Sequence, residues 1–117
     1  MSRQRSVGSA GLAGAAPVFA ALGDETRLRL VARLCAEGPL SIAHLSASAP
    51  VTRQAVTKHL HALAAAGLVR GKRRGRQRQR MWELEPRRLQ EARRYLDRIS
   101  ERWDDALERL RGFVEGT

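Results

Sequence analysis

Cysteine and aromatic residues are scarce in this sequence, and long hydrophobic runs are missing. Cys35 is the single cysteine among 117 residues, which excludes an internal disulfide framework and a zinc site of several thiolates. One thiol also fits a reducing cytoplasm. Aromatic residues make up 4%, so a core drawn from the 43% of hydrophobic residues must be mainly aliphatic. No apolar run approaches the roughly 20 residues of a membrane span. These absences predict one small cytoplasmic domain.

The composition divides the chain into three parts. Residues 1–16 are rich in glycine, alanine and serine, and Arg3 and Arg5 give them a faint likeness to a secretory signal. Glycines and Pro17 interrupt the apolar stretch that such a signal requires. We therefore expect a flexible arm over residues 1–16, a folded core over residues 17–85 and a helix over residues 86–115.

A dense basic block is the most informative feature of the sequence. Residues 70–80 hold seven of the 22 basic residues, and without them the net charge of +10 falls to +3. A polyanion is the natural partner of such a block, because neutralising phosphates releases condensed counterions. The alternative is a solvated basic loop or a disordered tail. Strand-like sequence on both sides favours a loop held in place and in contact with nucleic acid.

Capping residues and apolar spacing predict two helices near the start of the core. The first covers Phe19–Leu22 and ends at Gly23. Asp24 is a good N-cap for the second, which stops at Gly38-Pro39. The apolar face of the second helix consists of Leu28, Val31, Ala32 and Cys35, widened by Leu30 and Leu34.

The next two helices are predicted to form a helix-turn-helix pair. Ser41 caps the third helix, and the segment 49–51 with its proline breaks it. Thr52 caps the fourth helix, which ends at Gly67. The third helix turns Ile42 and Leu45 inward, and the fourth buries Val56, Leu60 and Leu63. Two helices joined by such a tight turn are typical of DNA-binding domains.

Beyond Gly67 the apolar spacing changes from helical to strand-like. Leu68 and Val69 begin one strand, and residues 81–84 form another with Trp82 and Leu84 on one face. The basic block then becomes the tip of a hairpin. Such a wing can follow the DNA backbone or enter a minor groove while the fourth helix occupies the major groove.

A long last helix is predicted from Pro86, which suits a first helical turn. Its apolar residues recur every three or four positions to the end of the chain: Leu89, Ala92, Leu96, Ile99, Trp103, Ala106, Leu110 and Phe113. About 28 residues would make it about 40 Å long, more than this small core can cover. We expect a homodimer interface; a helix folded back on its own domain is the alternative. The expected interface residues are Phe19, Leu96, Ile99, Trp103, Leu110 and Phe113.

Polar residues on the fourth helix and in the hairpin are the candidate DNA contacts. Arginine and glutamine side chains bind guanine and adenine edges, and the first turns of such a helix enter the groove. We assign base reading to Arg53, Gln54 and Thr57, and backbone or groove-edge contacts to Lys58 and His59. The full candidate set is Thr52, Arg53, Gln54, Thr57, Lys58, His59, Lys72, Arg73, Arg74, Arg76 and Arg78.

Three segments resemble the ArsR/SmtB family of winged helix-turn-helix repressors. They read ALGDETRLRL at residues 21–30, PVTRQAVTKHL at residues 50–60 and AGLV at residues 66–69, in the family's order and spacing. The likeness covers about residues 17–115. The second segment and RWDDAL at residues 102–107 are most similar to the non-metal-sensing branch of SdpR-type autorepressors.

This resemblance implies a mostly helical fold with a small β-hairpin wing, dimeric through its long last helix. It also implies a cytoplasmic homodimer that binds an inverted repeat near a promoter, associates with the bacterial nucleoid when bound, and blocks transcription, commonly of its own gene. In the family, the positions matching Thr57 and His59 face DNA, and the wing contacts the flanking groove.

The residues do not support the metal sensing known in other branches of the family. Ser41 and Ala43 stand at the positions of the family's paired cysteines, and the last helix contains no histidine. We expect no metal and no cofactor, although a site built on His44 is an alternative. Cys35 is expected to be a buried inert thiol; the alternative, a redox switch, needs an exposed reactive thiolate.

The sequence favours a regulator over an enzyme, because it contains no phosphate-binding glycine loop, nucleophile elbow or paired inward carboxylates. Two alternative functions stay open. One is an architectural protein that binds nucleic acid without sequence preference. The other is a protein-protein interaction module in which the basic loop is incidental.

Overall fold

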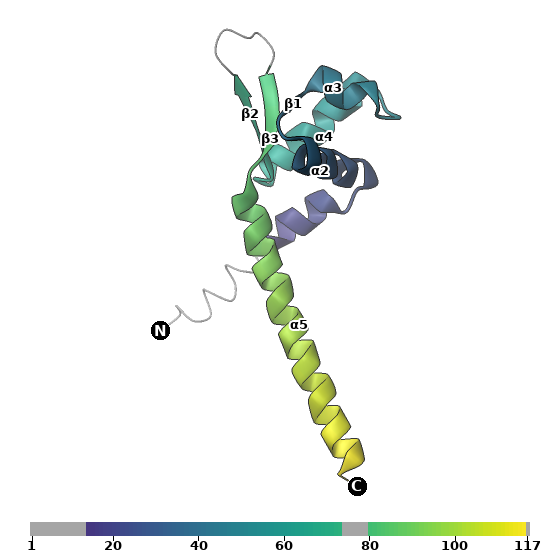
Figure 1. Cartoon of the computed structure of the whole chain (residues 1–117), viewed down its shortest axis with the longest axis vertical. Coiled ribbons are helices and arrows are strands. Elements are labelled where there is room, and N and C mark those ends of the chain that lie inside the picture. The colour runs from purple at the N-terminus through teal and green to yellow at the C-terminus, as the bar shows by residue number, and fades with distance from the viewer. Residues whose placement is uncertain (1–13, 74–79, 117) are drawn as a thin grey trace.

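The computed structural model describes residues 14–73 and 80–116 (Figure 1). It is mostly helical, with a small antiparallel sheet, and has the predicted winged helix-turn-helix architecture. Residues 14–22 form an N-terminal helix. The elements that follow are α2 (Glu25–Glu37), β1 (Leu40–Ser41), α3 (Ile42–Ala47), α4 (Arg53–Ala65), β2 (Val69–Arg73), β3 (Arg80–Leu84) and α5 (Pro86–Glu115).

Side-chain caps begin three of the helices where the sequence predicts them. The Asp24 carboxylate accepts a hydrogen bond from the Arg27 backbone N–H at 3.0 Å. The hydroxyl of Ser41 accepts from the N–H of His44 at 3.2 Å, and that of Thr52 from Ala55 at 3.1 Å. Each cap satisfies an N–H that has no partner inside its helix. The predicted starts of α2, α3 and α4 are confirmed.

Gly67 ends α4 and turns the chain into β2. It adopts a φ of 78°, which favours glycine. The N–H of Gly67 donates to the carbonyl of Ala64, and the N–H of Leu68 donates to the carbonyl of Leu63, both at 2.9 Å. This pair of bonds is the Schellman arrangement of helix ends. It places Leu68 and Val69 in the core and starts the hairpin at a fixed position.

The sheet has three strands in the order β1-β3-β2, all antiparallel. The hairpin of β2 and β3 is confirmed, and Trp82 lies opposite Gly71 within it. The strand β1, in which Leu40 and Ser41 pair with Trp82 and Met81, was not predicted. Two residues are too few to show strand alternation, so this strand exists only through its pairing with β3.

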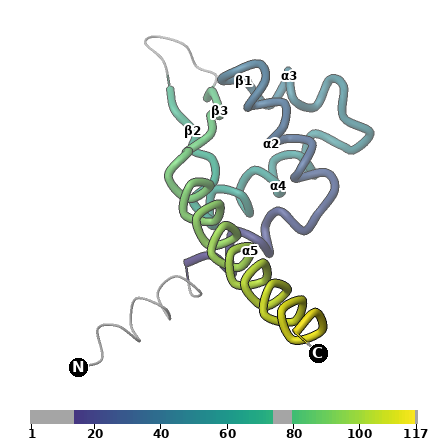
Figure 2. Tube along the Cα trace, turned by 60° about the horizontal axis from the view of Figure 1, so that its bottom comes forward, coloured from purple at the N-terminus to yellow at the C-terminus, as the bar shows by residue number. Residues whose placement is uncertain are grey.

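An aliphatic core lies between the helices and the sheet. Val56, Leu60 and Leu63 of α4 are fully buried, together with Leu45 of α3 and Leu68. Trp82 adds the one aromatic ring of the buried cluster among the described residues. Figure 2 shows α2, α3 and α4 gathered on one side of the sheet strands, with α5 leading away. The predicted inward faces of α3 and α4 are thus confirmed.

The predicted apolar face of α2 is wrong in part. Leu30 and Leu34 are buried at 3% exposure, whereas Leu28 is 49% exposed and Ala32 is also exposed. Cys35 is exposed, so the expectation of a buried thiol is wrong as well. Two apolar stripes run along this helix, and helical spacing alone does not tell which one faces the core. The buried stripe consists of Leu30 and Leu34, which are one helical turn apart and belong to the core cluster.

The N-terminal helix begins earlier than the sequence indicates. Residues 14–16, which belong to the predicted arm, are helical, and Ala15 and Val18 are buried. The rest of the arm, residues 1–13, lies outside the described residues. Phe19 is partly buried and packs on Tyr95 of α5 in its own chain, with ring centroids 6.3 Å apart. This contact ties the N-terminal helix to the start of α5.

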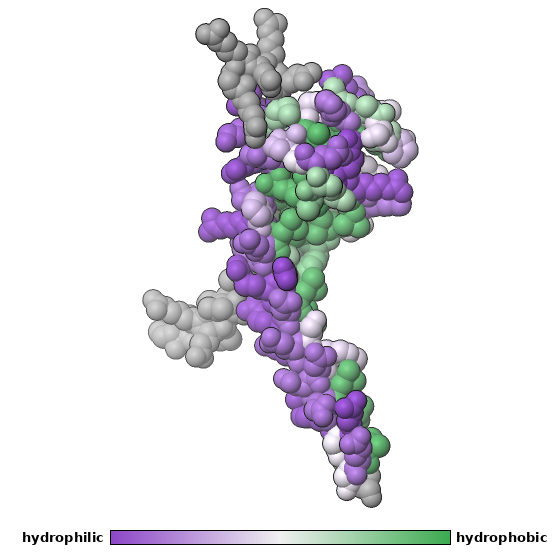
Figure 3. All heavy atoms as spheres, in the orientation of Figure 1, coloured by the Kyte–Doolittle hydropathy of each residue, from purple (hydrophilic) through white to green (hydrophobic). Residues whose placement is uncertain are grey.

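The helix α5 leaves the core after its first turns. Ala92 is its buried residue, whereas Leu96, Trp103 and Phe113 are 49%, 63% and 73% exposed. Figure 3 shows hydrophobic atoms along one edge of the far half of α5 and hydrophilic atoms along the other. The helix therefore does not fold back on its own domain. None of the helices among the described residues combines the length and the hydrophobicity of a membrane-spanning segment.

Replacing Leu60 by alanine tests the core. Its side chain is fully buried, so Leu60→Ala should lower the free energy of unfolding by about 2–5 kcal/mol, because it removes apolar contacts and leaves a cavity. Urea denaturation at one fixed protein concentration measures the change. The control is Gln54→Ala, which lies exposed on the same helix and should change the unfolding free energy by less than about 0.5 kcal/mol. Equal effects of the two variants would contradict this packing.

Candidate nucleic-acid interface

The helix-turn-helix pair and the hairpin lie at one end of the molecule. Figure 1 shows α3 and the hairpin at the end opposite the C-terminus of α5. The candidate contact residues on α4 and β2 therefore belong to the same end. The sequence of α4 contains no acidic residue. This end can face a polyanion without carboxylates of α4 repelling it.

The first turns of α4 carry its exposed polar side chains. Arg53, Gln54 and Lys58 are exposed. Two predicted contacts already use their hydroxyls within the helix: that of Thr52 caps α4, and that of Thr57 donates to the carbonyl of Arg53 at 2.9 Å. A hydroxyl that donates inward still offers its oxygen as an acceptor. The charged and amide groups of α4 are therefore its donors toward a partner.

His59 faces the start of α2 rather than open solvent. Its Nδ1 accepts a hydrogen bond from Nε of Arg27 at 3.2 Å and lies 3.9 Å from the carboxylate of Asp24. The His59 side chain is 20% exposed. Because these contacts tie α4 to α2, His59 serves the placement of the helix in this structure. A DNA contact by its ring stays a prediction.

The two faces of the hairpin differ in how their positive charges are compensated. Strand alternation puts Arg70 and Lys72 on one face, and Arg73 and Arg80 on the face that carries Trp82. Arg70 donates to Glu83 of β3 and to Glu85 just beyond this strand, each at 2.9 Å, so its charge is paired. Lys72 and Arg73 are exposed. The predicted contacts Arg74, Arg76 and Arg78 lie outside the described residues.

Arg80 was not among the candidate contacts, although the structure places it beside them. Its guanidinium lies over the Trp82 ring, 6.0 Å from the centroid. The signal was present in the sequence: a strand with Trp82 and Leu84 on one face must carry residue 80 on that face too. In the sequence, Arg80 is also the last residue of the basic block, which hides its place on the strand face.

The histidines and Cys35 do not come together. His61 packs beside Trp82 with ring centroids 6.0 Å apart, and Nδ1 of His44 lies 3.4 Å from the hydroxyl of Ser41. Within residues 14–73 and 80–116, no group of three His, Cys, Asp or Glu residues could hold a metal ion. The expectation that the protein needs no metal stays a prediction.

The charge of Asp24 makes the start of α2 sensitive to acid. The pKa of this carboxyl is lowered from its ordinary 3.8, chiefly because the backbone N–H of Arg27 donates to it; the nearby His59 and Arg27 charges contribute too. A lowered pKa in the folded state stabilises the fold above pH 3.8, and this contribution is lost as the pH falls through the lower folded pKa.

The variant Asp24→Asn keeps a capping side chain and removes the charge. The wild-type protein should have the larger unfolding free energy near neutral pH, and this difference should shrink as the pH falls below 3.8. Urea denaturation of both proteins across this range measures it. A difference that stays constant into strong acid would contradict the role of the carboxylate.

Comparisons with known proteins agree with this geometry. Residues 22–72 match the model of a helix-turn-helix domain family, from the end of the N-terminal helix into β2. The chain is 41% identical over 87 residues to the HTH-type transcriptional regulator Rv2034 of Mycobacterium tuberculosis, covering 74% of this chain and 76% of that protein.

Solved structures show the same likeness. An ArsR-like transcriptional regulator from Rhodococcus sp. RHA1 superposes with a TM-score of 0.75 at 37% identity, covering 87% of this chain and 93% of that one. A homodimeric winged helix-turn-helix DNA-binding domain from Mycobacterium bovis, Mb0332, shares the fold with a TM-score of 0.58 at 22% identity, covering 83% and 84%. With its acid-free α4 and its basic hairpin, the chain belongs to the ArsR family of helix-turn-helix transcriptional regulators, which act by binding DNA.

Proposed function

We propose that this chain is a repressor that binds an inverted-repeat operator as a homodimer. In this proposal the operator lies in the promoter of the chain's own gene. The protein acts by occupying DNA rather than by catalysis. One observation carries the proposal: the exposed donors of α4 and the basic hairpin lie at one end of the fold. That arrangement suits a helix in the major groove with a wing on the adjacent backbone.

In this proposal the first turns of α4 read bases. Arg53 and Gln54 offer the bidentate donors and acceptors that distinguish guanine and adenine, with Thr57 beside them. Lys58, His59 and the hairpin cations Lys72 and Arg73 contact phosphates or the groove edge. The same backbone role is proposed for Arg74, Arg76 and Arg78.

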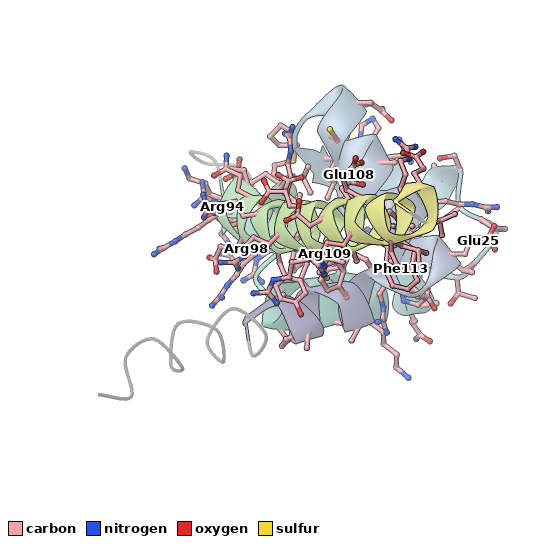
Figure 4. The ribbon with its side chains drawn as sticks, turned by 90° about the horizontal axis from the view of Figure 1, so that it is seen from below. Glu25, Arg94, Arg98, Glu108, Arg109 and Phe113 are labelled. Carbon is pink, nitrogen blue, oxygen red and sulfur yellow. The ribbon has the colours of Figure 1, made fainter. Side chains whose placement is uncertain are left out.

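The dimer is proposed from the unpaired apolar stripe of α5. Ile99 and Leu110 are 46% and 59% exposed, in line with the still more exposed Trp103 and Phe113. Figure 4 shows Phe113 and Glu108 on opposite edges of the helix, so these apolar and acidic side chains face different ways. An apolar stripe of this length is unfavourable in water unless a second copy covers it. A rigid dimer would hold two α4 helices about 34 Å apart, as successive major grooves require.

Selection of genomic fragments bound by the full-length chain, followed by footprinting, tests the regulator function. We expect a protected palindrome with two half-sites one helical turn apart. Uniform coverage of any duplex would instead support the architectural alternative. A chain that binds no duplex would support the interaction module.

A base-reading role of Gln54 predicts a loss confined to the operator. Gln54→Ala should weaken operator binding by about 1–3 kcal/mol and leave binding to a random duplex almost unchanged. Fluorescence anisotropy with both duplexes at one salt concentration measures this. The control is Ala65→Gly, because Ala65 is exposed at the far end of α4. It should lower the affinity for the operator no more than the affinity for the random duplex. Equal losses of Gln54→Ala on both duplexes would show that Gln54 does not read a base.

The dimer proposal makes Trp103 an anchor. Trp103→Ala should weaken dimerisation by about 2 kcal/mol or more, because a large aromatic side chain loses its burial in the partner. Sedimentation equilibrium measures the change. The control Glu101→Ala, on the polar edge of the same turn, should leave the dimer intact. A monomeric wild-type chain would rule out the proposed interface.

A further inference from the structure

A small cavity lies between the start of α3, the first turn of α4 and the start of β3. Its volume is about 150 Å³, and it is lined by Ser41, Ile42, Ala43, Arg53 and Arg80. This is below the roughly 300–1,000 Å³ of sites that bind drug-sized molecules. Two arginines and no acidic residue line it. The cavity therefore suits one small anion.

Gly71 makes room for the side chain of Arg80. A Cβ atom on Gly71 would overlap Cδ of Arg80 and lie 3.0 Å from its Cγ and 3.2 Å from its Nε. The φ angle of Gly71 is not positive, so its backbone does not require glycine. The missing side chain on β2 is instead what lets Arg80 cross above it, over Trp82.

The positive charges around the cavity are not balanced by carboxylates. Arg73 lies directly opposite Arg80 in the hairpin register. Like charges opposite each other on neighbouring strands are destabilising. Arg70 of the same hairpin has two glutamate partners, whereas the ion pairs among the described residues include none for Arg53, Arg73 or Arg80. An anion held between these groups would remove the repulsion.

We propose that Arg80, with Arg73 opposite it, holds one phosphodiester group of the DNA backbone beside the base-reading Arg53, and that Gly71 positions Arg80 for this contact. The inference rests on the proposed DNA-binding function and adds its anchoring point. Guanidinium groups bind phosphate oxygens in bidentate geometry. The cavity joins the recognition helix to the wing, so a phosphate fixed there sets how deeply α4 enters the groove.

Salt titrations of four full-length proteins test the proposal. These are wild type, Arg80→Ala, Gly71→Ala and the charge-matched control Arg109→Ala on the far half of α5. Affinity for the selected operator and for a random duplex is measured across a range of KCl concentrations. Arg80→Ala should weaken binding to both duplexes by a similar factor, about tenfold or more. It should also lower the slope of log affinity against log salt by about one per protomer. Arg109→Ala should bind as wild type does.

The variant Gly71→Ala distinguishes a specific phosphate contact by Arg80 from general electrostatic attraction of DNA, because it changes no charge. It should nevertheless reproduce the loss seen in Arg80→Ala. In the double variant Gly71→Ala/Arg80→Ala, the added methyl group has no arginine to displace, so affinity should equal that of Arg80→Ala alone. The double variant also keeps the test valid if Gly71→Ala alone folds poorly.

Two results would overturn the proposal: wild-type affinity of Gly71→Ala, or a loss in Arg80→Ala no larger than in Arg109→Ala. Either could occur while the operator is still recognised, which would leave the regulator function intact. Conversely, the variants could lose DNA affinity as expected although the wild-type chain does not prefer its operator over random DNA. That result would support the phosphate contact and refute the sequence-specific repressor. A wild-type chain that binds no duplex would refute both.

Discussion

The rotation of α4 about its own axis is the constraint on which the rest of the structure depends. Val56, Leu60 and Leu63 are fully buried against α3 and the sheet, so this edge of α4 can face only inward. The opposite edge, with Arg53 and Gln54, is thereby turned outward. The same packing brings Leu68 into the core and starts β2 directly after α4. Burial of three aliphatic side chains thus places both the helix and the hairpin that are proposed to meet DNA.

Arginine serves two purposes in this chain, and the structure separates them by their partners. Arg70 joins β2 to two glutamates, and Arg33 donates to the carbonyl of His44 at 3.2 Å and to the hydroxyl of Ser48 at 2.7 Å. These side chains hold neighbouring elements together. A second group near the first turn of α4 lacks such acidic partners among the described residues, and its charge is available to a polyanion: Arg53, Arg73 and Arg80.

Most of the fold could be predicted because its signals are local. The caps at Asp24, Ser41 and Thr52 and the stop at Gly67 each depend on a few neighbouring residues. The strand β1 and the buried stripe of α2 could not, since both are decided by partners distant in sequence. The site was predicted less fully. The exposed positions of α4 followed from its apolar spacing, but the bond between Arg27 and His59 and the path of Arg80 over Gly71 arise only when separate elements meet.

Two copies of this reading end, linked through α5, would match the two-fold symmetry of an inverted repeat. The most direct test is the affinity of the purified full chain for double-stranded DNA as the salt concentration rises. The account predicts clear binding in dilute buffer and a steep linear fall of log affinity with log salt, by about 0.9 for each phosphate neutralised. Absence of binding at low salt, or an affinity that does not change with salt, would contradict it.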